Sequence, residues 1–345
     1  MATIVTSVTA HRTQPLAGLT AWLVSTGMTG MDVQMRGVAD ALGLDYQMKH
    51  ITPRGIWKAM APWGPVAPSE RFGQSGAPFS APWPAVAIGL GRSSAPYLRA
   101  LRRHADKSMF TLMMQDTKAG VGIADLIWVP EHDRLRGPNV ITTLVAPHSF
   151  NQERLAELHR LLPAPMTALP TPRAAVVLGG TNAVYRYTER DCARLAGSLA
   201  SLGALGASFL ITSSRRTQLP LLQAVEEATR PFLRILYAGK GDNPYGSFLA
   251  HADFFVVTAD SVNMTGEACA TGRPVLVFIP TGGSPKFQRF HAALQAYGAT
   301  RPLPERVTKF PDWHYAPLHS ARDIAREVEK YWLAKMHEQM EPTSR

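Results

Sequence analysis

The sequence of 345 residues has only two cysteines, Cys192 and Cys269. Two cysteines cannot form a disulfide framework, so we expect both to be small packing residues in a reducing compartment. No Gly-x-Gly-x-x-Gly fingerprint with a following acidic ribose ligand occurs, and no Gly-x-Ser-x-Gly elbow occurs. These absences argue against an NAD enzyme and against a serine hydrolase.

The chain also lacks a convincing membrane span. The longest uncharged stretch, residues 195–214, is interrupted by Gly197, Gly203 and Gly206, which predicts a helix, a turn and a buried strand. The first basic residue is Arg12, so the start does not resemble a signal peptide. We therefore expect a soluble cytoplasmic protein.

Charge is unbalanced in one direction. The formal net charge is +10, which favours an anionic partner such as a nucleotide diphosphate or an anionic membrane surface. No basic-aromatic repeat or nucleic-acid motif is present, so we expect no nucleic-acid partner. A peripheral position on the inner face of a membrane is compatible with this charge.

Apolar runs alternate with helical patterns in two halves of the chain, which predicts an α/β protein with two parallel sheets. Four prolines in residues 163–172 indicate an interdomain linker. The predicted parts are a flexible arm over 1–17, a first domain over 18–162, the linker over 163–172, a second domain over 173–315, and a terminal segment over 316–345 whose helix packs back on the first domain.

Residues 52–82 are rich in proline, glycine and tryptophan, and form an irregular excursion from this pattern. Four apolar side chains lie close together there: Ile56, Trp57, Met60 and Trp63. They could contact a membrane surface or simply pack on the first domain. The sequence leaves both interpretations open.

In the second half, polar residues follow the predicted buried strands. Parallel sheets bind ligands at the carboxyl ends of their strands, so these residues are candidates for a phosphate and ribose site. Arginines bind phosphate in a bidentate manner, a helix start attracts anions, and a carboxylate can hold ribose hydroxyls. The candidates are Gly179, Gly180, Thr181, Asn182, Ser213, Ser214, Arg215, Arg216, Asp260, Ser261, Asn263, Met264 and Glu267.

The run over residues 252–277 resembles the donor-site region of GT-B glycosyltransferases, such as the peptidoglycan precursor N-acetylglucosaminyltransferase. The resemblance implies two Rossmann-like, doubly wound domains that face a cleft. It also implies that Glu267 holds the ribose of UDP, and that Gly180 and Ser261 hold the diphosphate. There is no Asp-x-Asp pair for a metal, so we expect no metal and no cofactor besides a UDP-linked nucleotide sugar as co-substrate.

A longer resemblance, from about residue 23 to 301, is to the elongated-mitochondria fission-factor family, which has bacterial homologues. The segments that carry it are Gln34, 115–116, 130–133, 146–148, 179–180, 212–217, 243–245 and 257–264. It adds Asn243 and Tyr245 to the candidate nucleotide site. The family's name implies a protein partner of the dynamin type.

Residues 27–32 resemble the acceptor-side loop of GT-B enzymes, including the lipid A disaccharide synthase. Asp32 could act there as the general base for an acceptor hydroxyl, or it could cap a helix. Asp116 and His148 follow predicted strands and are further catalytic candidates. Residues 131–133 read Glu-His-Asp, but neighbouring side chains point in different directions, so we expect no metal site there.

Three functions fit these observations. The first is a metal-independent glycosyltransferase that uses a nucleoside-diphosphate sugar and a cell-envelope or lipid-linked acceptor. The second is a nucleotide-sugar epimerase on the same fold. The third is a non-catalytic adaptor that recruits a partner protein to a membrane.

Overall fold

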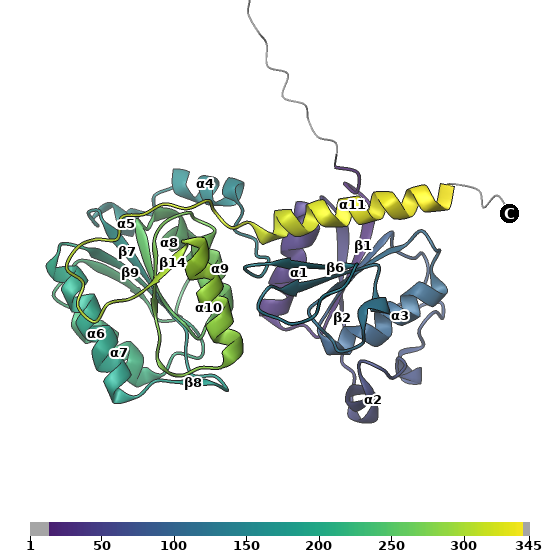
Figure 1. Ribbon diagram of the computed structural model, residues 1–345, viewed down its shortest axis with the longest axis horizontal. Helices are drawn as coiled ribbons and strands as arrows, with labels where there is room; N and C mark the ends of the chain where they lie inside the picture. Colours follow the sequence, from purple (N-terminus) through teal and green to yellow (C-terminus); the bar gives the residue numbers. More distant parts are fainter. Residues whose placement is uncertain (1–13, 341–345) are drawn as a thin grey trace, which may run out of the picture.

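The computed structural model describes residues 14–340 and shows two α/β domains side by side (Figure 1). Each domain contains a six-stranded sheet in which all neighbouring strands are parallel. The α/β class and the doubly wound arrangement predicted from the sequence are confirmed. The arm predicted over 1–17 falls mostly on residues 1–13, which lie outside the described residues, while Leu16 is fully buried in the first core.

The N-terminal sheet has the strand order β2-β1-β3-β4-β5-β6. Its strands are β1 (Thr20–Ser25), β2 (Asp45–His50), β3 (Val86–Leu90), β4 (Phe110–Met114), β5 (Leu126–Pro130) and β6 (Val140–Thr143). Helix α1 (Thr29–Ala41) covers one face, and α3 (Ala95–His104) covers the other. Continuous apolar runs such as that of β3 suit strands buried on both faces.

Strand β2 is absent from the sequence prediction. Its residues Asp45–His50 are mostly polar and alternate between exposed and half-buried. It lies at the edge of the sheet, where only β1 pairs with it, from Thr20 opposite Asp45 to Ser25 opposite His50. A polar edge strand lacks the apolar run by which the other strands are recognised.

The C-terminal sheet has the strand order β10-β9-β7-β11-β12-β14. Its strands are β7 (Arg173–Leu178), β9 (Ser208–Ser213), β10 (Arg234–Tyr237), β11 (Phe254–Thr258), β12 (Val275–Phe278) and β14 (Thr300–Pro302). A small antiparallel ladder joins β8 (Tyr185–Arg186) to β13 (Thr281–Gly282).

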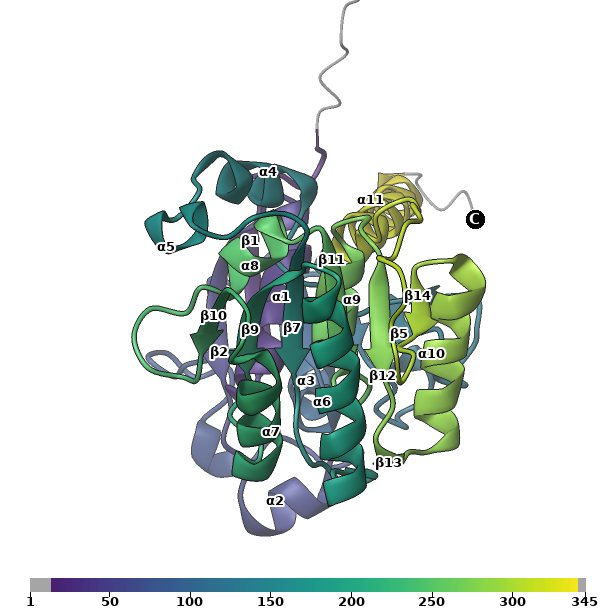
Figure 2. The ribbon, with the colours of Figure 1, turned by 90° about the vertical axis from the view of Figure 1, so that its left-hand side faces the viewer.

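Helices cover both faces of this sheet. The outer face packs on α6 (Glu189–Ala204) and α7 (Leu219–Thr229), which Figure 2 shows in front of the sheet. The other face packs on α8 (Tyr245–His251), α9 (Val262–Cys269) and α10 (Pro285–Tyr297). Residues 195–214 form the end of α6, a turn and β9, as predicted. None of the helices within residues 14–340 has the length and apolar character needed to cross a membrane.

The chain enters the C-terminal domain earlier than the sequence indicated. Val145 is already buried in the C-terminal core, and α4 (Gln152–Arg160) packs on α8 rather than on the first domain. His159 Nδ1 lies 2.9 Å from the Ala250 carbonyl, and its ring stacks on that of His251. The predicted linker holds α5 (Ala164–Thr167), and Met166 is buried. The boundary at 162 is therefore wrong, because the prolines lie within the second domain.

The last helix, α11 (Ser320–Met340), lies along the first domain (Figure 1). Ile324, Ala325 and Val328 are buried in the N-terminal core, against α1 and the sheet. The Tyr331 hydroxyl donates to the Pro138 carbonyl at 2.6 Å. The chain thus crosses between the domains twice, near residues 144–148 and again just before α11.

Candidate functional site

Each of the two sheets has a topological switch point, which is a pair of neighbouring strands from which the strand order runs outward in opposite directions. In the C-terminal sheet this point lies between β7 and β11, and in the N-terminal sheet between β1 and β3. Ligands of doubly wound sheets bind outside the carboxyl ends of the strands at such points. Three loops meet at the C-terminal switch point, and they consist of residues 179–182, 213–217 and 260–263.

The Asp260 carboxylate joins these loops. Its Oδ2 accepts the Gly180 amide at 2.8 Å, and its Oδ1 accepts the Tyr187 hydroxyl at 2.6 Å. Arg216 Nη2 lies 3.4 Å from Oδ2. The carboxylate is fully buried, and its partners supply the donors that a buried charge requires. Burial first, and then the charge of Asp260, raise the pKa of Tyr187. Asp260 therefore fixes the loops and does not itself face a ligand.

The two glycines are required by close packing. A Cβ on Gly179 would lie 2.2 Å from Asp260 Oδ2, and a Cβ on Gly180 would lie 1.9 Å from the Arg216 carbonyl oxygen. The sequence assigned the Gly180 amide to the diphosphate, and this assignment is wrong, because the amide donates to Asp260 instead.

Three more predicted ligands serve the loops themselves. The Asn182 side chain accepts the Val184 and Tyr185 amides and donates to the Asp260 carbonyl. The Ser214 hydroxyl lies 3.1 Å from Thr217 Oγ1, and the Ser213 hydroxyl donates to a carbonyl of β10 at 3.4 Å. These polar groups hold the backbone in position at the strand ends.

Other predicted groups remain open to a ligand. Arg215 is exposed, and the Arg216 side chain is 47% exposed beside its contact with Asp260. The Thr181 hydroxyl is buried and has no hydrogen-bond partner among the described residues. A buried hydroxyl without a partner is costly, and a bound polar ligand would satisfy it. Thr181, Arg215 and Arg216 thus provide one donor and two cations beside the same loops.

Helix α9 begins at this site. The Ser261 hydroxyl accepts the Met264 amide at 3.4 Å and caps the helix, and Met264 packs against the C-terminal core. Asn263 is exposed and reaches the other domain, where its Oδ1 accepts Gln34 Nε2 at 3.4 Å. The first turn of α9 therefore faces α1 across the domain interface.

Glu267 lies one turn further along α9. Its Oε2 accepts the Tyr245 hydroxyl at 2.6 Å, and Asn243 Oδ1 in turn accepts the Tyr245 amide at 3.1 Å. Burial raises the pKa of Glu267 to about 7, although the Tyr245 hydrogen bond acts to lower it. Asn243 and Tyr245 thus position Glu267.

This pKa leads to a prediction about pH. A carboxylate accepts hydrogen bonds from a pair of ribose hydroxyls better than a carboxylic acid does. On the predicted role of Glu267 as ribose ligand, affinity for UDP-N-acetylglucosamine should therefore rise about tenfold between about pH 6 and about pH 8 as Glu267 loses its proton. Over the range from 4.5 to about 7 the folded state keeps a proton that the unfolded state has lost, so the free energy of unfolding should fall as pH rises. Calorimetric titration and urea unfolding measure the two effects. Glu267→Gln should remove both pH dependences; if it keeps them, the carboxyl is not their source.

Next to the N-terminal switch point, at the end of the edge strand β2, lies a histidine that the sequence analysis missed. His50 ends β2, and its Nε2 lies 3.0 Å from Asp32 Oδ2, while Asp32 Oδ1 accepts the Ser25 hydroxyl at 2.5 Å. Asp32 is 9% exposed, whereas the His50 side chain is 50% exposed. The carboxylate thus orients an accessible imidazole, which is a better placed proton acceptor than Asp32 itself. Asp32 is not the helix cap, because Met28 occupies that position.

The other two catalytic candidates are less suited to that role. Asp116 follows β4 and contacts the Lys118 ammonium and amide, and these contacts outweigh burial and lower the pKa of Asp116. His148 is 7% exposed at the first domain crossing, where its backbone packs on Gly37. Burial lowers the pKa of His148 to about 4. His148 thus lies buried at the domain crossing, and its catalytic role stays a prediction.

Residues 131–133 of the N-terminal domain contact the C-terminal domain across the interface. Lys286 Nζ lies 2.7 Å from Asp133 Oδ1, and Arg289 donates twice to the His132 carbonyl at 3.1 Å. Both cations belong to α10 of the C-terminal domain. Together with the Asn263–Gln34 contact, they bring the candidate nucleotide loops and the Asp32–His50 pair to the same interface.

Two doubly wound domains with their candidate residues at facing switch points define a protein of GT-B-like fold. The UDP-GlcNAc 2-epimerase of Methanocaldococcus jannaschii has a similar fold, with a TM-score of 0.50 and 8% sequence identity. The similarity covers 90% of this chain and 99% of that chain. At this identity the likeness concerns the fold alone.

The chain belongs to the mitochondrial fission ELM1 family, whose model matches residues 29–332. It is 26% identical over 277 residues to the mitochondrial fission protein ELM1 of Arabidopsis thaliana. This match covers 73% of this chain and 65% of that protein. It is 32% identical over 165 residues to the uncharacterized protein RP120 of Rickettsia prowazekii (strain Madrid E). This match covers 46% of this chain and 46% of that protein. The chain thus spans less than two thirds of the length of these curated relatives.

Proposed function

We propose that this protein is a nucleotide-sugar-dependent glycosyltransferase with a UDP-linked donor and a lipid-linked or cell-envelope acceptor. The proposal rests on one observation. Three strand-end loops meet at Asp260, and Arg215 and Arg216 are exposed beside them. Such an arrangement of cations and a helix start suits a diphosphate. Glu267 on the same helix is the candidate ribose ligand.

The proposed chemistry divides between the domains. Arg215 and Arg216 stabilise the negative charge that develops on the leaving diphosphate. Across the interface, His50 accepts the proton of the acceptor hydroxyl, while Asp32 orients the ring and stabilises the imidazolium. Closure of the domains around both substrates excludes water and aligns the reacting groups.

Two other functions fit part of the structure. An epimerase could use the same nucleotide site without an acceptor, and the fold neighbour from Methanocaldococcus jannaschii carries that name. An adaptor is the second alternative, since the Arabidopsis relative is named a mitochondrial fission protein. Exposed Ile56 and Trp63, at 63% and 65% exposure, would suit membrane contact in an adaptor or in a transferase with a lipid-linked acceptor.

Calorimetric titration with UDP and UDP-N-acetylglucosamine tests the proposal directly. We expect Arg215→Ala and Glu267→Ala each to weaken binding about tenfold or more, because each removes a charge-assisted hydrogen bond. Arg190→Ala, an exposed arginine on α6, is the matched control and should bind like the wild type. If the folded wild-type protein binds neither these nor other nucleotides, both enzyme hypotheses fail and the adaptor remains.

A further inference from the structure

Four histidines lie in the contact between the two domains, a pair at each end. At one end the His132 ring of the N-terminal domain meets the Phe290 ring of α10 edge-on at 5.4 Å, and His291 is the next residue of that helix. At the other end His148 lies at the first domain crossing, and His319 lies at the second, directly before α11. These two are close enough for their charges to interact.

Each of these histidines has at least one buried ring nitrogen without a hydrogen-bond partner. Nδ1 of His132, His291 and His319 and both nitrogens of His148 have none among the described residues. His132 and His148 are only 6% and 7% exposed. An imidazolium is a donor at both nitrogens, so a proton on either ring would create a buried charge with an N–H group that lacks an acceptor.

The charges around His132 oppose its protonation. Lys286 and Arg289 face it from α10 of the other domain, and His291 faces it from the same helix. Asp133 acts in the opposite direction, but its Oδ1 already lies 2.7 Å from Lys286 Nζ. Burial first, and then Lys286, lower the pKa of His132 to about 4.

His291 is held as a neutral ring by its own domain. Its Nε2 lies 2.9 Å from the Ala259 carbonyl, so Nε2 is the protonated nitrogen and donates there. The Asp260 carboxylate also faces this ring. Burial lowers the pKa of His291, although the Ala259 carbonyl and Asp260 act to raise it.

The pair at the chain crossings is equally poor in acceptors. Burial first, and then His319, lower the pKa of His148 to about 4. Burial and Arg322 lower the pKa of His319, while Glu153 and Asp323 act to raise it. Arg322 of α11 donates to Glu153 of α4 at 2.9 Å, so this end of the contact also joins elements of both domains.

We propose that acidification separates the two domains, with the His132–His291 and His148–His319 pairs as the proton-sensitive contacts. In the closed structure the rings are confined to the uncharged form. Once the domains part, water reaches His132 and His148, and each ring can bind a proton. The two chain crossings keep the separated domains attached. The inference concerns the protein without substrates and does not rest on the proposed function.

The direction of the effect follows from the two forms of the protein. A hydrated imidazole has a pKa of about 6.5, whereas the pKa values of His132 and His148 in the closed form are about 4. Between these values opening takes up protons, so a fall in pH favours the open form. For each ring that becomes fully hydrated, the ratio of open to closed protein should rise roughly 30-fold from about pH 7.5 to about pH 5.

Two double variants remove the titrating rings, His132→Gln/His148→Gln and His132→Phe/His148→Phe. Glutamine keeps a polar side chain and phenylalanine keeps an aromatic ring, so either variant that folds suffices for the test. Arg289 donates to the carbonyl of residue 132, and both replacements preserve this contact. The matched control is His104→Gln/His314→Gln, which removes one exposed histidine from each domain.

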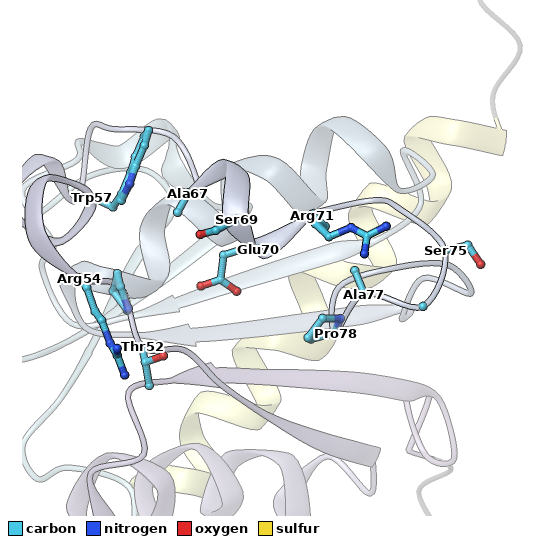
Figure 3. A pocket seen from close by; sticks show the side chains of 12 residues that line it. Thr52, Arg54, Trp57, Ala67, Ser69, Glu70, Arg71, Ser75, Ala77 and Pro78 are labelled. Carbon is cyan, nitrogen blue, oxygen red and sulfur yellow. The ribbon is translucent and has the colours of Figure 1, made fainter.

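Single-molecule energy transfer counts open and closed molecules of each protein. One dye is attached to Lys58→Cys on α2 (Gly55–Met60) and the other to Arg186→Cys on β8, since both positions are exposed and both elements lie at the same edge of the molecule in Figure 1. The two native cysteines are buried. Figure 3 shows the surface pocket beside α2, and its lining residues all come from residues 52–78, so α2 reports on the first domain alone.

We expect the ratio of open to closed wild-type protein to rise about 30-fold or more from about pH 7.5 to about pH 5, and the control to follow it. Both histidine-pair variants should respond at least about tenfold less. The proposal is overturned if the wild-type ratio does not change, if a folded histidine-pair variant responds like the wild type, or if the control loses the response. Circular dichroism at both pH values checks that the domains stay folded, and a loss of the wild-type signal in acid would overturn the proposal in favour of unfolding.

Discussion

Gly180→Ala should abolish the proposed nucleotide-sugar binding and lower the free energy of unfolding by about 3–5 kcal/mol, the sum of the cost of overpacking and the loss of a hydrogen bond to a charged group. The added Cβ would lie 1.9 Å from the Arg216 carbonyl oxygen and 2.7 Å from the Thr217 nitrogen. Both are backbone atoms, so no side-chain rotation can relieve the clash. The loops must separate, and the 2.8 Å hydrogen bond from the Gly180 amide to Asp260 would break.

Gly197→Ala is the matched control for this experiment. Gly197 lies within α6, and an added Cβ would have its nearest neighbour outside the backbone of that helix, the Glu305 carbonyl oxygen, at 3.9 Å. Alanine favours a helix over glycine, so this variant should gain roughly 0.5–1 kcal/mol. Urea unfolding and UDP-N-acetylglucosamine titration of both variants measure the contrast. Unchanged stability and affinity in Gly180→Ala would show that the loops at Asp260 are not tightly packed.

On the proposed function, His50→Ala should lower the turnover of the proposed transfer reaction roughly 100-fold or more, with little change in UDP-N-acetylglucosamine affinity. The half-exposed ring is the proposed proton acceptor, and it lies on the domain opposite the nucleotide loops. Added imidazole should partly restore the turnover, because it can replace the missing base. A side chain that only supports the fold would not respond to imidazole.

Asp32→Asn tests the positioning half of the pair. It keeps the shape of the side chain but removes the charge that faces His50 Nε2 at 3.0 Å, so turnover should also fall while imidazole gives no rescue. His314→Gln, an exposed histidine in the second domain, should leave turnover unchanged. If His50→Ala retains full turnover on an acceptor that the wild type uses, the assignment of His50 is wrong.

The sequence predicted the layers of the fold because most strands are buried on both faces. Continuous apolar runs such as those of β7 and β11 are recognisable without a structure. Strand β2 and its last residue, His50, were missed because an edge strand needs no such run. The only available sign was the short stretch between α1 and the proline-rich segment, which is long enough for one more strand.

The sequence also located the candidate nucleotide loops, because strand ends are easy to place once the strands are known. It could not distinguish polar groups that face a ligand from those that hold the loops. The same chemistry makes Asp260 a ligand candidate and an internal anchor, and only its partners Gly180 and Tyr187 decide between these roles. The domain boundary failed for a similar reason, since prolines mark irregular chain whether it links domains or packs within one.

The return of α11 to the first domain affects the order in which the molecule can form during synthesis. The second domain is nearly continuous in sequence, from about Val145 to the segment before Ser320, so its core can assemble as soon as that stretch has left the ribosome. The first domain, although synthesised earlier, cannot complete its core until Ile324 and Val328 have emerged. Until then α1 has an uncovered apolar face, and the half of the protein that is made first is the half that is finished last.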